Sequence, residues 1–222
     1  MGITNQVGAS SLIRPGVIDS AATRPASPYE GQVIFQKDTD QLLVWNGTAW
    51  VIPNSPAQNP MGLEYITSGT FSGSAIDGVF TSTYDNYRIV VSNIITSSNV
   101  LINFNFRNTT NATDSTSNYY TSGRRFDNGT NYDFSQGPVA YGTTAVNTTT
   151  VGSSSFIMDI FQPRTTNMTN VVLNGIGGIT TVCTVQSATV FYATTNFAGI
   201  IFSASGGNTI TGGLYTVYGY RK

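Results

Sequence analysis

The pattern of apolar and polar residues changes along the chain, and each change marks a different kind of segment. Residues 1–23 follow neither a helical nor a strand period, and their apolar side chains are widely spaced. This pattern predicts an extended N-terminal arm. The arm either docks its apolar side chains into grooves of a larger partner or stays a loose tail.

Residues 24–52 carry the signals of three short strands joined by tight turns. Gln32–Lys37 and Gln41–Asn46 are apolar, strand-like runs separated by an Asp-Thr-Asp turn, and Ala49–Ile52 begins a third run. Asn46-Gly47 is the strongest short signal of a hairpin, because a type I′ turn needs positive φ at both central residues. The segment therefore predicts a small three-stranded β-meander.

Both faces of this predicted meander are apolar. Side chains alternate along a strand, so Val33 and Phe35 point to one side and Ile34 to the other, and Leu42 likewise opposes Leu43. A sheet with one solvated face would alternate apolar and polar residues instead. Units below about 40 residues rarely fold without disulfides, metals or oligomerisation. We therefore expect copies of this module to cover one another. Threefold closure favours a homotrimer, although the pattern argues more firmly against a monomer than for three copies.

Residues 53–61 form a linker rich in Pro, Asn and Ser, and short strand-like runs follow it. In one run Ile102, Phe104 and Phe106 share a face, with asparagines opposite. The runs are Gly62–Ser68, Tyr87–Ile95, Val100–Arg107, Asn118–Phe126, Pro138–Tyr141, Ser154–Phe161, Asn170–Ile176, Val182–Tyr192, Ala198–Ser203 and Thr209–Tyr220. Many short strands without a helical stripe predict an all-β protein, with an antiparallel β-sandwich head over residues 62–222.

The chain is poor in charge. Charged residues make up 9% of it, against about 25% in ordinary soluble domains, and residues 165–220 contain none. Such a surface lacks the charge that keeps monomers apart, which favours an assembly. The formal net charge is −1 and no basic stripe occurs, so nucleic acid is not an expected partner. No apolar run reaches the roughly 18 residues of a membrane span, so no membrane partner is expected either.

The stretch from Arg24 to Val51 has the form R-P-x-S-P-Y-E-G-Q, then D-T-D, then V-W-N-G-x-A-W. It resembles a module near the N-terminus of tailed-bacteriophage virion proteins, which include fibres, collar appendages and head-decorating proteins, especially of phages that infect cyanobacteria and other marine bacteria. The resemblance implies a virion location, with residues 1–52 attached to other virion proteins. The residues expected to carry oligomerisation and anchoring are Arg24, Pro25, Pro28, Tyr29, Gly31, Phe35, Trp45, Asn46, Gly47 and Trp50.

Two further pieces, YDNYRIVVSNI and GGLYTVYGYRK, more loosely resemble the start and end of the C-terminal head domains of phage fibre proteins. This second resemblance implies that the sandwich is jelly-roll-like. Together the two resemblances imply a non-enzymatic trimeric tail or neck fibre that displays its head for host contact. A capsid-decorating protein and a polysaccharide-degrading tailspike are the alternatives.

The composition narrows the possible chemistry. The chain has no histidine and one cysteine, which excludes Ser-His-Asp and Cys-His nucleophiles, His-ligated zinc and thiolate clusters. No catalytic, cofactor or metal residue is therefore assigned. Asp127 and Asp133 are the best local pair for a glycosidase. The same DNGTNYD stretch has oxygen ligands for calcium without the spacing of an EF-hand. A polar hairpin tip with Asn128-Gly129 as the turn is the preferred interpretation.

Tyrosine and arginine gather around the same region, and aromatic side chains there suit contact with sugar rings. A host-surface glycan is the partner that such a surface would bind. Ordinary half-buried tyrosines of a sandwich are the alternative explanation. The possible receptor-facing residues are Tyr119, Tyr120, Arg124, Arg125, Asp127 and Tyr132.

Overall fold

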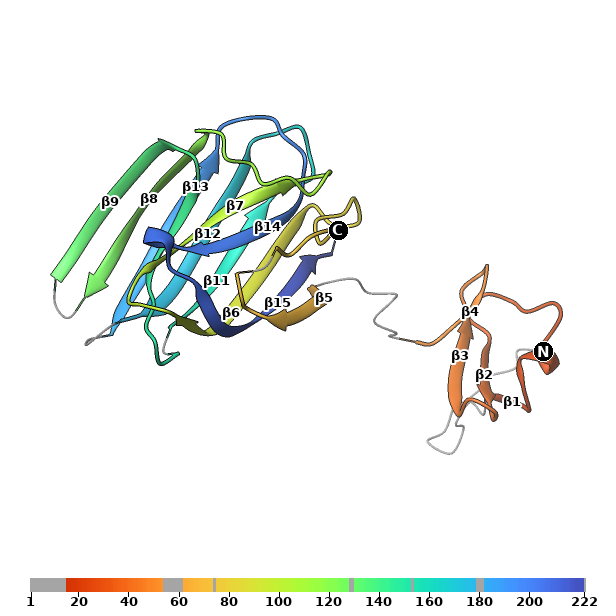
Figure 1. Cartoon of the computed structure of the whole chain (residues 1–222). Helices are drawn as coiled ribbons and strands as arrows, with labels where there is room; N and C mark the ends of the chain where they lie inside the picture. Colours follow the sequence, from red (N-terminus) through yellow and green to blue (C-terminus); the bar gives the residue numbers. More distant parts are fainter. Residues whose placement is uncertain are drawn as a thin grey trace, which may run out of the picture. The chain divides into compact units, whose positions relative to one another are not determined.

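The computed structural model describes residues 15–53, 62–73, 75–127, 130–152, 154–178 and 182–221. The chain divides into two compact units, Met1–Pro60 and Met61–Lys222, each built from strands (Figure 1). Residues 1–14 of the predicted arm, residues 54–61 of the predicted linker and the predicted Asn128-Gly129 turn lie outside the described residues. Within the described residues, no helix is long and apolar enough to cross a membrane.

The N-terminal unit is a four-stranded sheet in the order β1-β2-β3-β4. Its elements are β1 (Gly16–Ile18), the 3-10 helix η1 (Ala21–Thr23), β2 (Val33–Gln36), β3 (Gln41–Trp45) and β4 (Trp50–Val51). Strands β2, β3 and β4 form the expected antiparallel meander. Residues 16–18 of the predicted arm are extended, as expected, but they pair with β2 as a parallel strand and so belong to the sheet of the meander.

The β3–β4 connection also differs from the predicted two-residue turn. The register pairs Trp45 with Trp50, which leaves a four-residue loop between them. Only Gly47 has positive φ in this loop, at 96°. The Asn46 side-chain oxygen accepts hydrogen bonds from the backbone N–H of Thr48 at 3.0 Å and of Ala49 at 2.8 Å. Asn46 therefore acts through its side chain rather than through a left-handed backbone.

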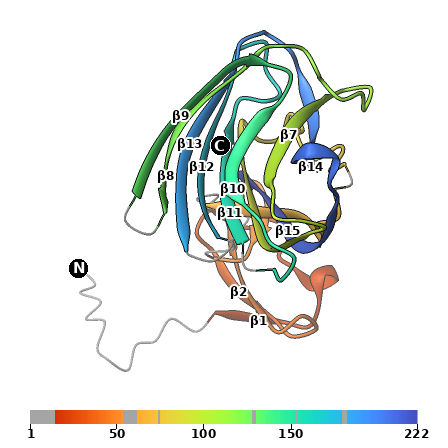
Figure 2. The same cartoon turned by 60° about the vertical axis from the view of Figure 1, so that its left-hand side comes forward.

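The C-terminal unit, called the head below, is an antiparallel sandwich, which confirms the fold class expected from the sequence. A three-stranded sheet, β10-β7-β14, packs on an eight-stranded sheet, β5-β15-β6-β11-β12-β13-β8-β9 (Figure 2). The elements are β5 (Leu63–Thr70), β6 (Asn86–Thr96), β7 (Leu101–Asn108), β8 (Tyr119–Asp127), β9 (Thr130–Val139), β10 (Gly142–Asn147), β11 (Ser154–Phe161), β12 (Thr169–Gly177), β13 (Cys183–Phe191), β14 (Phe197–Ala204), η2 (Ser205–Gly207) and β15 (Ile210–Tyr220).

The core lies between the two sheets and is rich in aromatic rings. The predicted face of Ile102, Phe104 and Phe106 points into it, and each of these side chains is at most 1% exposed. Phe106 stacks on Phe197 with ring centroids 4.6 Å apart. The buried Tyr119 hydroxyl accepts a hydrogen bond from the backbone N–H of Phe106 at 2.9 Å. A buried hydroxyl without a partner would destabilise this core, so the bond is part of what the aromatic packing requires.

The predicted Pro138–Tyr141 strand is wrong. Pro138 belongs to the end of β9, and Tyr141 lies in the connection to β10. The DNGTNYD stretch, residues 127–133, lies where β8 and β9 meet as an antiparallel pair, as a hairpin requires, but Thr130–Asp133 belong to β9 rather than to the tip. Polar residues alternate with Tyr132 and Phe134 along β9, and an edge strand with one open face tolerates that pattern.

An ionic cluster ties three strands together on the face of the eight-stranded sheet that points away from β10-β7-β14. Arg88 of β6 donates two hydrogen bonds of 2.7 Å to the Asp159 carboxylate of β11, and the Tyr220 hydroxyl of β15 donates a third, also of 2.7 Å. Burial alone would raise the pKa of Asp159, but the bonds from Arg88 and Tyr220 outweigh burial and hold that pKa below its ordinary value. Burial and the bond to Asp159 raise the pKa of Tyr220 to about 12.

We expect Asp159 to make the stability of the head pH-dependent. Because its folded pKa lies below the unfolded value of about 3.9, its contribution is complete above about pH 5. The contribution is lost as the pH falls through the lowered folded pKa. The difference in free energy of unfolding between the wild type and Asp159→Asn, measured in urea from pH 7 to pH 3, should therefore shrink toward acid. A constant difference over that range would contradict this linkage.

Candidate functional site

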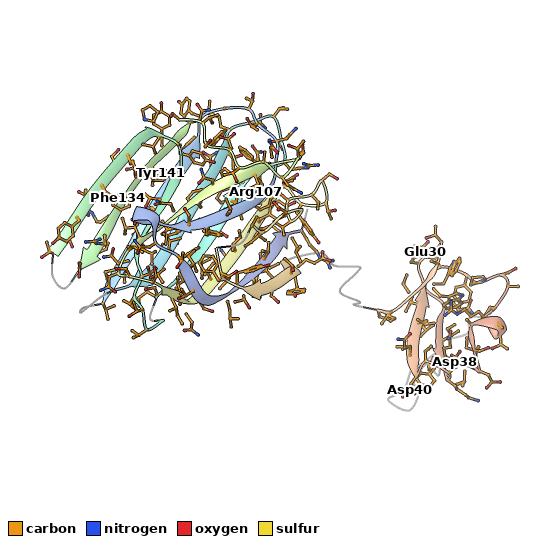
Figure 3. All side chains as sticks on the ribbon, viewed as in Figure 1. Glu30, Asp38, Asp40, Arg107, Phe134 and Tyr141 are labelled. Carbon is orange, nitrogen blue, oxygen red and sulfur yellow. The ribbon has the colours of Figure 1, made fainter. Side chains whose placement is uncertain are left out.

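Several of the predicted anchor residues hold the N-terminal unit together. The Arg24 guanidinium donates hydrogen bonds of 2.9 and 2.6 Å to the side-chain oxygen of Gln36, which is 2% exposed. Gln36 in turn donates from its Nε2 to Asp38 at 2.7 Å. These hydrogen bonds hold the segment before β2 against the face of the sheet that carries Gln36. Through Gln36 the bonds link Arg24 to Asp38, the first aspartate of the Asp-Thr-Asp turn, which is labelled in Figure 3.

The other anchor residues divide into turn formers, packed rings and exposed groups. Gly31 has φ of 84°, and its N–H donates to the Trp45 carbonyl at 2.8 Å, so glycine suits this turn. Trp45 and Trp50 pack edge to face with centroids 5.6 Å apart. Tyr29, in contrast, is 70% exposed. Pro25 and Pro28 lie in the segment between η1 and β2. Tyr29 is therefore the anchor residue most available to a partner.

One face of the N-terminal sheet is open and apolar, and we call it the apolar face. Cross-strand pairing places six side chains on it, and all are half-buried or exposed; Val17 is 59% and Leu42 43% exposed. The six are Val17, Val33, Phe35, Leu42, Val44 and Val51. A contiguous apolar patch on a solvent-facing sheet is typical of an interaction surface.

The opposite face is covered from within the unit. Ile34 is 1% exposed and Leu43 3% exposed, and Gln36 beside them bonds to Arg24. The prediction that copies of the module must cover both faces is therefore corrected: only the apolar face lacks a cover among the described residues. The sequence pattern assigned Val17 of this face to the arm. The only local indication of a strand there was the consecutive apolar pair of Val17 and Ile18.

The structure separates the residues predicted to face a receptor. Tyr119 is wrong as a surface residue, because it is 0% exposed and its ring packs against Phe106 and Phe191. Burial raises the pKa of its hydroxyl. Its neighbour Tyr120 points the other way, is 42% exposed and packs edge to face on Tyr192. Successive residues of β8 necessarily face opposite sides of the sheet.

The remaining four predicted residues also divide between the two faces of β8 and β9. On the outer face, which points away from the three-stranded sheet, Arg124 pairs with Asp133 at the surface. On the inner face, which points toward that sheet, the Arg125 guanidinium carbon lies 5.1 Å from the centroid of the Tyr132 ring. Arg125 also pairs with Asp127 at 3.5 Å. The inner face therefore brings together Arg125, Asp127 and Tyr132.

This arrangement bears on the two chemical alternatives. Asp127 and Asp133 lie on opposite faces of the β8–β9 pair and each pairs with a different arginine. They do not flank a common cleft, so this pair lacks the arrangement of glycosidase carboxylates. Within the described part of the chain, no group of three or more metal-ligating side chains comes together.

Comparisons of the chain with protein-family models, curated proteins and solved structures found no match. Two surfaces of the described residues stand out as candidate functional sites: the apolar face of the N-terminal unit and the inner face of β8 and β9.

Proposed function

We propose that this protein is a non-enzymatic structural protein of a tailed-bacteriophage virion, built as a trimeric tail or neck fibre. Its N-terminal unit assembles the trimer and attaches it to other virion proteins. Its sandwich head projects outward for contact with the host surface. The single observation that carries this proposal is the apolar face, which the described residues of the N-terminal unit leave without a cover.

The size of the N-terminal unit supports self-association. Its four described strands run from Gly16 to Val51, and one of its two faces has no cover of its own among the described residues. Phe35 and Leu42 pair across β2 and β3 at the middle of the apolar face. Around a threefold axis, three copies of this face meet each other, so each subunit covers the apolar side chains of the next. The assembled N-terminal units would then hold three heads together in one particle.

The organisation of the chain supports an attachment role. Residues 24–51, whose form resembles the module of phage virion proteins, lie in a unit separate from the head. Within that unit the module's residues build turns and packing, through Arg24, Gly31 and Asn46, and leave Tyr29 exposed. A module that folds by its own bonds and keeps exposed residues suits attachment to different partners.

The first test is the mass of the full-length protein in solution, measured by light scattering coupled to size exclusion at micromolar concentration. The expected mass is three times the 23.7 kDa of one chain. Two tryptophans occur in the chain, and both lie in the N-terminal unit, so their fluorescence reports the folding of that unit. A folded species with the mass of one chain would overturn the assembly part of the proposal.

The second test is the position of the protein on the particle. Electron cryomicroscopy of the encoding phage, with an antibody against the head as a marker, should show label on fibres of the tail or neck. Label spread over the capsid would replace the fibre with a capsid-decorating protein. An unlabelled particle would reject the virion assignment.

A further inference from the structure

A groove of about 370 Å³ lies on the head between β8–β9 and the three-stranded sheet. The sandwich produces it because its sheets are unequal. β9 is the last strand of the eight-stranded sheet, while β10 is the edge of the three-stranded sheet, so the two edges face each other across an opening. The residues that line the groove include Leu101, Arg125, Tyr132, Phe134, Gln136 and Thr143.

One glycine shapes the floor of this groove. Gly123 of β8 pairs with Phe134 of β9, and a Cβ at position 123 would lie 2.7 Å from the Phe134 ring. The tip of the ring therefore lies close over Gly123, where the side chain of a larger residue would displace it. Figure 3 shows Phe134 on the β9 side of the head. The space above it stays open for a ligand.

The walls combine an aromatic surface with hydrogen-bonding groups. The Tyr132 ring is 49% exposed and is held by Arg125 on one side. The Arg125 side chain lines the groove and is 24% exposed, so its guanidinium places N–H donors at the wall. Gln136 adds an amide from β9, and Thr143 adds a hydroxyl from β10. The groove thus offers ring stacking beside several donors and acceptors.

We propose that this groove binds a neutral saccharide unit of a surface glycan. The inference deepens the host contact assigned to the head and rests on that proposed function. The C–H face of a sugar ring packs on the exposed face of Tyr132, and its hydroxyls exchange hydrogen bonds with Arg125, Gln136 and Thr143. A volume near the lower end of the usual range for ligand sites suits a small ring rather than a folded partner.

Charge selects the class of sugar. Arg125 is the only ionised residue that lines the described groove, and Asp127 lies 3.5 Å from its guanidinium. The pair is close to neutral as a whole, so the groove has no excess positive charge to recruit a carboxylate or sulfate. Hydroxyl groups, which both donate and accept, match the amide and hydroxyl of the walls better than an anion does.

The test is binding of the full-length protein to an array of immobilised neutral, amino and acidic oligosaccharides. Tyr132→Ala should weaken binding to the recognised neutral glycan at least roughly tenfold. Tyr120→Ala is the matched control, because it removes the same ring from the neighbouring strand at 42% exposure, on the outer face. It should leave binding unchanged. Gln136→Ala gives a second variant, and circular dichroism verifies that each variant folds.

The possible outcomes test the saccharide site separately from the proposed function of the whole protein. Equal losses in the Tyr132 and Tyr120 variants, or binding only to acidic glycans, would overturn the neutral saccharide site. The saccharide site would also be overturned if the wild type bound no glycan. It would likewise be overturned if a peptide that pairs with the edge of β9 displaced the bound glycan. None of these results changes the mass of the assembly or its position on the particle, which test the proposed function independently.

Discussion

Leu42→Asp is expected to convert the proposed trimer into folded single chains. Leu42 is 43% exposed in one copy and lies at the middle of the apolar face, beside its cross-strand partner Phe35. Association would place an unpaired carboxylate in an apolar interface, which costs about 3–5 kcal/mol. That corresponds to roughly 100- to 4,000-fold weaker association for each contact. Light scattering at micromolar concentration should then report the mass of one chain.

The adjacent residue provides the matched control. Gln41 is also exposed and lies on the same strand, but its side chain points to the opposite face of the sheet. Gln41→Asp adds the same charge and should leave the proposed trimer intact. Tryptophan fluorescence from Trp45 and Trp50 shows whether each variant keeps its N-terminal unit folded. If both variants dissociate, or neither does, the apolar face is not the surface that joins the copies.

Phe106→Ala is expected to destabilise the head by about 3–5 kcal/mol, because it removes a fully buried ring from a tightly packed core. Phe106 contacts Phe197 at 4.6 Å between centroids and also contacts Phe104 and Phe191. No single neighbour can fill the cavity left by the ring without breaking its own contacts. The melting temperature of the head, followed by near-ultraviolet circular dichroism, should fall by roughly 6–20 °C.

Phe126→Ala is the control for this loss. Phe126 is 39% exposed and lies beside Arg124 on the outer face of β8, so its removal leaves the core intact. Its expected effect is within about 0.5 kcal/mol. The tryptophans lie outside the head, and their fluorescence transition should not move in either variant. A melting temperature unchanged by Phe106→Ala would show that the two sheets do not pack as described.

Strands that are buried on one face could be predicted from the sequence. The alternation of Ile102, Phe104 and Phe106 with asparagines identifies β7 because each apolar side chain enters the core. The pattern fails for β10, where Gly142–Asn147 carries threonines and is buried almost throughout. Thr144 is 0% exposed, and its hydroxyl donates to the Ile102 carbonyl at 2.8 Å. Hydrogen bonds of this kind cannot be seen in a hydropathy pattern.

The candidate sites were less predictable, because they depend on the register between strands. The aromatic and arginine residues near β8 could be found by composition, but the face each occupies follows from the pairing of β8 with β9. Tyr119 and Tyr120 are adjacent in sequence, but they lie on opposite faces of the sheet, and Tyr119 is 0% exposed whereas Tyr120 is 42% exposed. Gln136 and Thr143 complete the groove from strands whose bounds the pattern missed. Val17 likewise joins the apolar face only through a parallel partner.

The first and last strands of the head are neighbours. Leu63 of β5 pairs with Tyr220 of β15, Arg221 donates its N–H to the Gly62 carbonyl at 3.1 Å, and its guanidinium pairs with Glu64 at 2.9 Å. A domain whose two ends emerge side by side can be cut out and fused elsewhere without stretching any strand. Recombination near residue 61 would therefore exchange this unit as a whole without separating β5 from β15.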